Sequence, residues 1–169
     1  MELDSSLSWM ALTLTPGIAA RLSARLLKEF GSPDDVFRAP LRRLEACNIP
    51  APAAQAIVKK DSFKRAERDL TNLRKVVAAR VINWTEPEYP QTLLQIYDPP
   101  VMLYVRGNSQ ILNAPSLKIV GTRKPTLYGS QMAQRPGRNL VVRGIVIVSG
   151  LARGIDAMAH QGALAVGGL

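Results

Sequence analysis

The sequence has little of the residue types that build disulfide scaffolds, metal centres and most catalytic sites. Its 169 residues include one cysteine, Cys47, and one histidine, His160. A lone cysteine excludes an intrachain disulfide and indicates a reducing compartment. Because there is no cluster of histidines, cysteines and carboxylates, we expect neither a metal site nor a cofactor.

Long apolar runs are also missing. The stretch from Trp9 to Ala20 is broken by two threonines and by Pro16, so it is too short and too polar to span a bilayer. The chain begins MELD, which lacks the cationic start of a signal peptide. No helix carries a clear basic amphipathic pattern for a membrane surface. We therefore expect a soluble, cytoplasmic protein with no membrane partner.

Two motifs that bind nucleotide phosphates do not occur either. The P-loop motif G-x-x-x-x-G-K-[ST] is absent, and no G-x-G-x-x-G follows either predicted strand of the C-terminal part. These absences argue against a P-loop NTPase and against a standard dinucleotide-binding site.

What the chain does have is positive charge, and the charge is unevenly distributed. The net charge is +9. Residues 117–169 hold seven Lys or Arg and one acid, Asp156, whereas residues 81–116 hold one cation and three acids. A solubilising surface charge is one interpretation. The concentration of cations near the C-terminus favours a functional patch for a polyanionic partner.

Residues 1–78 read as a small all-helical module with five short helices. Ser32-Pro33-Asp34-Asp35 is typical of a helix start, with a hydroxyl cap, a proline in the first turn and acids near the positive end of the dipole. Gly31 fits the end of the preceding helix. We expect Asp61 to cap the last helix, with one face formed by Ala66, Leu70, Leu73 and Val77.

The rest of the chain predicts an α/β fold. Residues 79–116 form a proline-punctuated connecting segment with short strands. Residues 117–169 alternate strand, helix, strand and helix, which indicates the first part of a Rossmann-like parallel sheet. We expect Pro136 to kink or end the first of these helices near residues 134–135.

Two loops follow the two predicted strands of that sheet. GTRKP begins at residue 121 and SGLARGID at residue 149. Ligands of parallel sheets lie beyond the carboxyl ends of the strands, so neighbouring strands would bring these loops together. Glycines allow positive φ and close approach, and Arg and Lys bind phosphate. The predicted phosphate site comprises Gly121, Thr122, Arg123, Lys124, Ser149, Gly150, Arg153 and Gly154.

The remaining polar residues of this region suggest support rather than catalysis. Asp156 and His160 lie four residues apart on one helix face and can pair with each other. Tyr128, the only aromatic residue after residue 116, can stack a base or simply pack beside Gly129. The glycines can likewise be tight turns and the cations merely solvated.

These residues carry a family resemblance. LKIVGTRKPTLYG followed by VIVSGLARGIDAMAHQGAL resembles the DNA-processing protein A family, and residues 89–108 resemble the lead-in to its nucleotide-fold domain. TPGIAARLSARLLKEFGSPDDVF is similar to the family's helical, SAM-like module, in which a turn such as Pro16-Gly17-Ile18 is related to helix-hairpin-helix motifs.

The resemblance implies a bacterial cytoplasmic protein of natural transformation that is not an enzyme. Such a protein binds single-stranded DNA, protects the incoming strand, helps load a RecA-type recombinase and forms a homodimer. The resemblance assigns DNA contact to the same two loops, with Asp156 and His160 as supports of the second loop. It also implies that the family's sheet and dimer surface continue beyond Leu169, so we expect a truncated chain of low stability or one that self-associates.

Two other hypotheses stay open. One is a nucleotide-phosphate-binding enzyme of Rossmann-like architecture, similar to phosphoribohydrolases, although the P-G-G-x-G-T-x-x-E motif that supplies their carboxylate is absent. The other is an inactive truncated fragment whose helical module serves only protein contacts.

Overall fold

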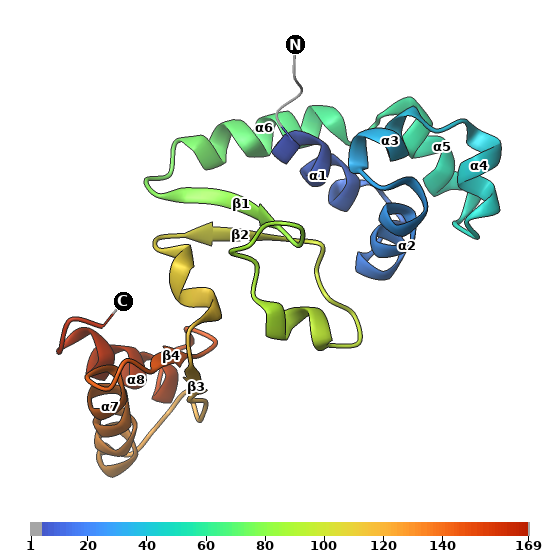
Figure 1. The fold of residues 1–169 in the computed structure, drawn as a ribbon. Coiled ribbons are helices and arrows are strands. Elements are labelled where there is room, and N and C mark those ends of the chain that lie inside the picture. The colour runs from blue at the N-terminus through green and yellow to red at the C-terminus, as the bar shows by residue number, and fades with distance from the viewer. Residues whose placement is uncertain (1–4, 169) are drawn as a thin grey trace. The chain divides into compact units, whose positions relative to one another are not determined.

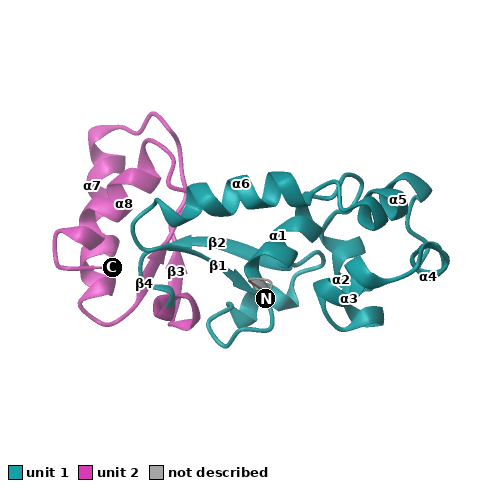
Figure 2. Cartoon of the chain, turned by 90° about the horizontal axis from the view of Figure 1, so that it is seen from above, with its two compact units in different colours: residues 1–109 teal, residues 110–169 magenta. Residues whose placement is uncertain are grey.

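The computed structural model describes residues 5–168 and divides the chain into two compact units, residues 1–109 and 110–169 (Figure 2). The first four residues and Leu169 lie outside the described residues. The expectation about a signal peptide rests on the former, and the expectation of a truncated chain rests on the latter. The confirmed fold class is a helical module followed by part of a parallel sheet.

Six α-helices form most of the described part of unit 1 (Figure 1). Local signals explain their limits well. Gly31, with φ 87°, ends α2, and the Ser32 side chain accepts a hydrogen bond from the Asp35 backbone N–H at the start of α3. The six are α1 (Ser5–Leu14), α2 (Ala20–Phe30), α3 (Pro33–Arg38), α4 (Leu41–Ala46), α5 (Ala51–Lys59) and α6 (Phe63–Arg74).

The start and the far end of α6 differ from the sequence prediction. The residue directly before the helix is Ser62, not the predicted Asp61. Ser62 does not cap the helix with its side chain, because its hydroxyl lies in the interior, 3.1 Å from Thr15 Oγ1. The helix ends at Arg74, and Val77 beyond it is 80% exposed. The predicted apolar face therefore consists of the buried Ala66 and Leu70 with the half-buried Leu73.

A β-hairpin completes unit 1. Strands β1 (Ala79–Asn83) and β2 (Met102–Arg106) pair antiparallel, and β1 packs against α1 and α6. Val81, Val101 and Met102 lie in the same hydrophobic core as the helices. The predicted domain boundaries at residues 78 and 116 stay a prediction. In the structure, the compact unit that contains the helices extends to residue 109.

Unit 2 is a small two-layer α/β arrangement. Strands β3 (Ser116–Lys118) and β4 (Val146–Val148) pair in parallel, with Leu117 opposite Ile147. Helix α7 (Leu127–Val141) connects them and α8 (Ile155–Leu164) follows β4. Ile147 packs on Ala159 and Ala163 of α8 in a core far smaller than that of unit 1.

Helices α7 and α8 pack together closely through glycines. A Cβ on Gly137 would lie 2.3 Å from the Ala159 carbonyl oxygen, and one on Gly162 would lie 2.2 Å from the Gln134 carbonyl oxygen. Contacts this short are possible only without a side chain. The early helix end expected at Pro136 is wrong, because α7 continues through this proline to Val141. Packing against α8 offsets the hydrogen bond that the proline removes.

Replacing Gly162 with alanine tests this close packing. Gly162→Ala is expected to lower the free energy of unfolding by about 2–3 kcal/mol, because the new methyl group collides with the backbone of α7. Urea unfolding followed by circular dichroism measures the change. Gly129→Ala in α7 is the control: its Cβ meets nothing closer than 3.4 Å, so it is expected to change stability by less than about 1 kcal/mol. Equal stability of the two variants would contradict the packing.

Candidate nucleic-acid interface

The two basic loops leave the sheet side by side because their strands are parallel neighbours. The backbone N–H of Ile119, just after β3, donates to the Val148 carbonyl at 2.9 Å, which extends the pairing to the end of β4. The segments 121–125 and 149–154 then follow at the same edge of the sheet. This is the edge at which parallel α/β sheets hold their ligands.

A direct backbone contact joins the loops. The N–H of Ile155 donates to the Thr122 carbonyl at 3.1 Å. Gly154 has φ 87°, and a Cβ there would lie 2.3 Å from the same carbonyl oxygen and 2.7 Å from Arg123 Cα. Only glycine fits this position, on both conformational and steric grounds. The contact holds Arg123 beside Arg153.

The glycines of the loops serve different purposes. Of the three predicted to allow positive φ, only Gly154 has it. Gly121 is needed for space instead, since a Cβ there would lie 2.7 Å from Cγ1 of Ile155. The left-handed residue of the second loop is Leu151, with φ 55°, a costly conformation for a side chain of this size.

Asp156 and His160 hold the second loop in shape. The buried Asp156 carboxylate accepts hydrogen bonds from the backbone N–H of Gly150 at 3.0 Å and of Ala152 at 3.4 Å. His160 Nε2 forms a hydrogen bond with Ser149 Oγ at 2.7 Å, in which either atom can be the donor. The Leu151 N–H donates to the same hydroxyl oxygen at 3.1 Å. The two residues thus bond to the loop rather than to each other.

The first loop is fixed by two hydroxyls. Thr122 Oγ1 accepts from the Lys124 N–H at 3.1 Å, which leaves the hydroxyl hydrogen of Thr122 available to a ligand. Thr126 Oγ1 accepts from the Gly129 N–H at 3.1 Å and caps α7. Proline 125 lies between the two hydroxyl residues. The loop therefore has little freedom apart from its two exposed cationic side chains.

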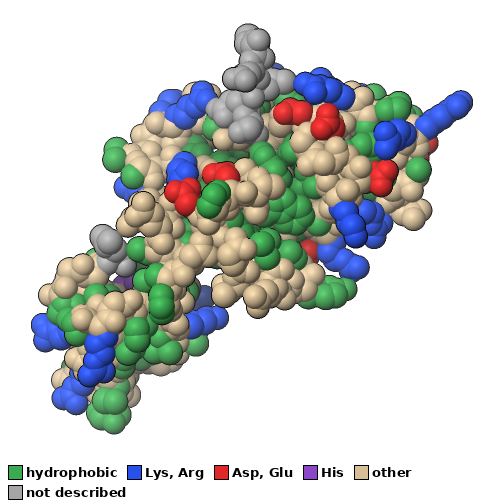
Figure 3. Space-filling model, viewed as in Figure 1, with side chains coloured by type: hydrophobic (Ala, Val, Ile, Leu, Met, Phe, Trp, Pro, Cys, Tyr) green, Lys and Arg blue, Asp and Glu red, His purple; other side chains and the backbone are tan. Residues whose placement is uncertain are grey.

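Three cations line an open cleft between the loops. The cleft has a volume of about 550 Å³ and is lined by Arg123, Lys124, Ala152 and Arg153. All three cationic side chains are exposed. The single acid of unit 2, Asp156, is buried, and the face of unit 2 visible in Figure 3 displays Lys and Arg side chains. Helix α8 begins directly after the second loop, with the buried Asp156 in its first turn.

The structure distributes the predicted site residues over three kinds of position. Arg123, Lys124 and Arg153 line the cleft, while Ser149 is engaged within the loop scaffold. Tyr128 lies at the start of α7 and is 71% exposed. Two leucines close in sequence to the cleft residues, Leu127 and Leu151, are both more than three-quarters exposed and were not predicted to be. Exposed leucines carry no sequence signal that distinguishes them from core leucines.

The lining of the cleft consists of two arginines, one lysine and one alanine. Within the described residues, no group of three or more His, Cys, Asp or Glu is placed to hold a metal ion. None of the helices between residues 5 and 168 combines the length and the apolar composition needed to cross a bilayer.

The fold and the cleft define a class of α/β protein that presents two glycine-containing basic loops at the carboxyl edge of a parallel sheet. The chain belongs to the DNA recombination-mediator protein A family, whose model matches residues 80–169.

Individual relatives agree with this assignment. The DNA processing protein DprA of Bacillus subtilis is 35% identical over 130 residues, which cover 69% of this chain and 43% of that protein. DprA of Streptococcus pneumoniae is 42% identical over 84 residues, or 47% of this chain and 28% of that one. The X-ray structure of the S. pneumoniae protein matches 99% of this chain and 56% of its own with a TM-score of 0.74 at 26% identity. The chain thus spans less than half the length of these curated relatives.

Removing the Asp156 carboxylate tests the scaffold of the second loop. Asp156→Ala leaves the Gly150 and Ala152 N–H groups without their acceptor, so it is expected to destabilise the protein by about 2 kcal/mol. Hydrogen exchange at these two amides is expected to accelerate, while exchange in β1 and β2 of unit 1 serves as the internal control. Unchanged protection of both loop amides would show that the carboxylate does not hold the loop.

Proposed function

We propose that this chain binds single-stranded DNA by its sugar-phosphate backbone, in the cleft between the two loops. The observation that carries the proposal is the position of Arg123, Lys124 and Arg153 around one open cleft whose loops are joined by the Ile155–Thr122 hydrogen bond. Arginine binds phosphate oxygens with two parallel hydrogen bonds, and lysine adds a point charge. The Thr122 hydroxyl supplies a further donor.

Exposed apolar and aromatic side chains near the cleft residues in sequence favour a single strand over a duplex. Tyr128, Leu127 and Leu151 are exposed on the same two loops and the first turn of α7. Unpaired bases can stack or pack on such side chains, whereas the bases of a duplex are already stacked. Because the cleft offers cations and no set of donors and acceptors for base edges, we expect little dependence on base sequence.

Family membership supports a role in DNA processing, and the finer role is part of the proposal. The family's description names a recombination mediator, and the similar proteins of B. subtilis and S. pneumoniae are called DNA processing proteins. We propose that the chain acts in the bacterial cytoplasm during natural transformation, where it protects incoming single strands and helps load a RecA-type recombinase. No catalytic step is part of this role.

Charge removal in the cleft tests the DNA site. Arg123→Ala and Arg153→Ala are each expected to weaken binding of an oligothymidylate and to reduce the slope of log K against log salt by about 0.7–1, since each removes one phosphate contact. Fluorescence anisotropy over a salt series measures both quantities. Double-stranded and mixed-sequence oligonucleotides show whether strand state and sequence matter.

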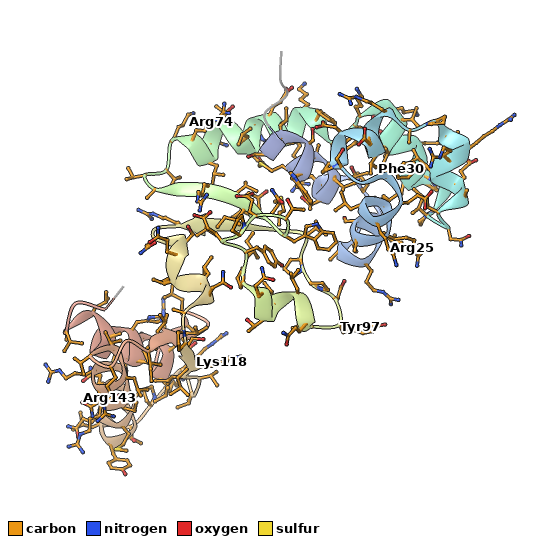
Figure 4. The ribbon with its side chains drawn as sticks, viewed as in Figure 1. Arg25, Phe30, Arg74, Tyr97, Lys118 and Arg143 are labelled. Carbon is orange, nitrogen blue, oxygen red and sulfur yellow. The ribbon has the colours of Figure 1, made fainter. Side chains whose placement is uncertain are left out.

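The matched control is Arg143→Ala. Arg143 is an exposed arginine of the same unit, but it precedes β4 and so lies at the opposite edge of the sheet (Figure 4). Its replacement is expected to leave the salt slope unchanged. If both loop variants bind like the wild type, or if Arg143→Ala weakens binding as much as they do, the cleft is not the site.

The recombinase step has its own test. We expect the chain to shorten the lag before a RecA-type protein forms filaments on single-stranded DNA, and the Arg123→Ala/Arg153→Ala variant to lose this effect. Fluorescence of labelled DNA follows filament growth. An unchanged lag with a chain that nevertheless binds DNA would remove recombinase loading from the proposed function and leave the binding proposal standing.

A further inference from the structure

A second cationic surface lies on unit 1. Helix α2 exposes Arg21, Arg25 and Lys28 at positions i, i+4 and i+7, while its opposite face buries Ser23, Leu26 and Leu27. Residues at this spacing share one side of a helix, and the four residues from Arg21 to Arg25 advance roughly 6 Å along its axis.

An exposed aromatic ring adjoins one end of this row. Tyr97, in the segment after the 3-10 turn Gln91–Gln95, is 83% exposed. Arg21 Nη1 donates to the Tyr97 hydroxyl at 2.9 Å, and the Arg21 guanidinium carbon lies 5.0 Å from the ring centroid. The arginine therefore holds the ring against α2, and the solvent-exposed ring remains available for stacking. We call Arg21, Arg25, Lys28 and Tyr97 the α2 stripe.

The other end of the α2 stripe borders a pocket of about 500 Å³. Arg25 and Lys28 line it together with Glu29, Arg43, Ala46, Cys47 and Asn48. Arg25 Nη1 donates to the carbonyls of Cys47 at 3.2 Å and Asn48 at 3.4 Å, which fixes the guanidinium and leaves its Nη2 and Nε hydrogens for a ligand. The one acid of the pocket, Glu29, is neutralised by Arg43 at 3.3 Å. Figure 4 shows Arg25, Phe30 and Tyr97 in this part of unit 1.

We propose that the α2 stripe is a second binding surface for single-stranded nucleic acid, separate from the loop cleft. Its cations are spaced to follow a phosphate backbone, and the exposed ring of Tyr97 offers a base a stacking platform. A basic track beside an exposed aromatic residue is the chemistry with which proteins bind single strands without reading sequence. An acidic protein surface would use the cations but would not need the ring.

The test uses four forms of the full chain: the wild type, the loop variant Arg123→Ala/Arg153→Ala, the stripe variant Arg25→Ala/Lys28→Ala, and the combination. The stripe variant is expected to lower the salt slope for oligothymidylate by about 1.4, at about 0.7 for each lost phosphate contact, in both backgrounds. Because loop and stripe are changed separately, failure of the loop proposal and failure of this one give different results.

A charge-matched control separates a site from bulk attraction. Lys64→Ala/Lys75→Ala also removes two exposed cations of unit 1, from the start and the end of α6. It is expected to bind like the wild type. If the stripe variant binds no worse than this control, the proposal is overturned and an acidic protein partner becomes the better occupant. Lys28→Glu alone tests the surface without disturbing the carbonyl contacts of Arg25.

Replacing Tyr97 tests base stacking separately from the attraction between charges. Tyr97→Ala is expected to weaken binding about fivefold or more by removing a stacked base, with little change in salt slope, whereas Tyr97→Phe keeps the ring and most of the affinity. Equal affinity of the Ala and Phe variants would show that no base stacks there.

The lone cysteine gives a direct footprint of the same surface. Burial and then the Glu29 carboxylate raise the pKa of Cys47, so alkylation of this pocket residue is best followed at alkaline pH. Oligothymidylate at about ten times its Kd is expected to slow that alkylation about tenfold in the loop variant. An unchanged alkylation rate at saturating oligonucleotide would place the DNA elsewhere.

Discussion

The hydrogen bond from Ile155 N–H to the Thr122 carbonyl is the contact on which the cleft depends. It brings together three cationic side chains that repel one another, so the loops cannot be held by their own charges. Backbone bonds, the tight fit of Gly154 and the buried Asp156 carboxylate supply the attraction instead. The repulsion then remains as a driving force for an anionic ligand, because a phosphate relieves it without any rearrangement of the backbone.

The two loops lead into a closely packed helix pair. Helix α7 begins directly after the first loop and α8 directly after the second, and the two helices pack closely at Gly137 and Gly162. This packing also explains why α7 continues through Pro136. The local cost of an interior proline is a few kcal/mol, and a long interface with small residues on both sides can offset it.

Local signals were sufficient to predict much of the fold from the sequence. The Ser32 cap, the Gly31 helix end and the parallel order of β3 and β4 all follow from residue type and spacing. Tertiary interactions decided the rest. Ser62 faces Thr15 in the interior instead of capping α6, and Ser149 bonds to His160, contacts between residues that no short window of sequence brings together. The three cations that line the cleft could be named from the sequence because cations directly after strands are a local signal, whereas the exposure of Leu127 and Leu151 could not.

The two basic surfaces differ in a way that suits one flexible ligand. The cleft holds its cations on constrained loops, while the α2 stripe presents them on long side chains along a helix. Each surface alone offers only a few phosphate contacts, and such binding is weak at physiological salt. A strand held at one surface raises the effective concentration of its neighbouring nucleotides at the other wherever the strand is long enough to reach. We therefore expect the affinity for long single strands to exceed that of either surface alone, without any base-specific contact.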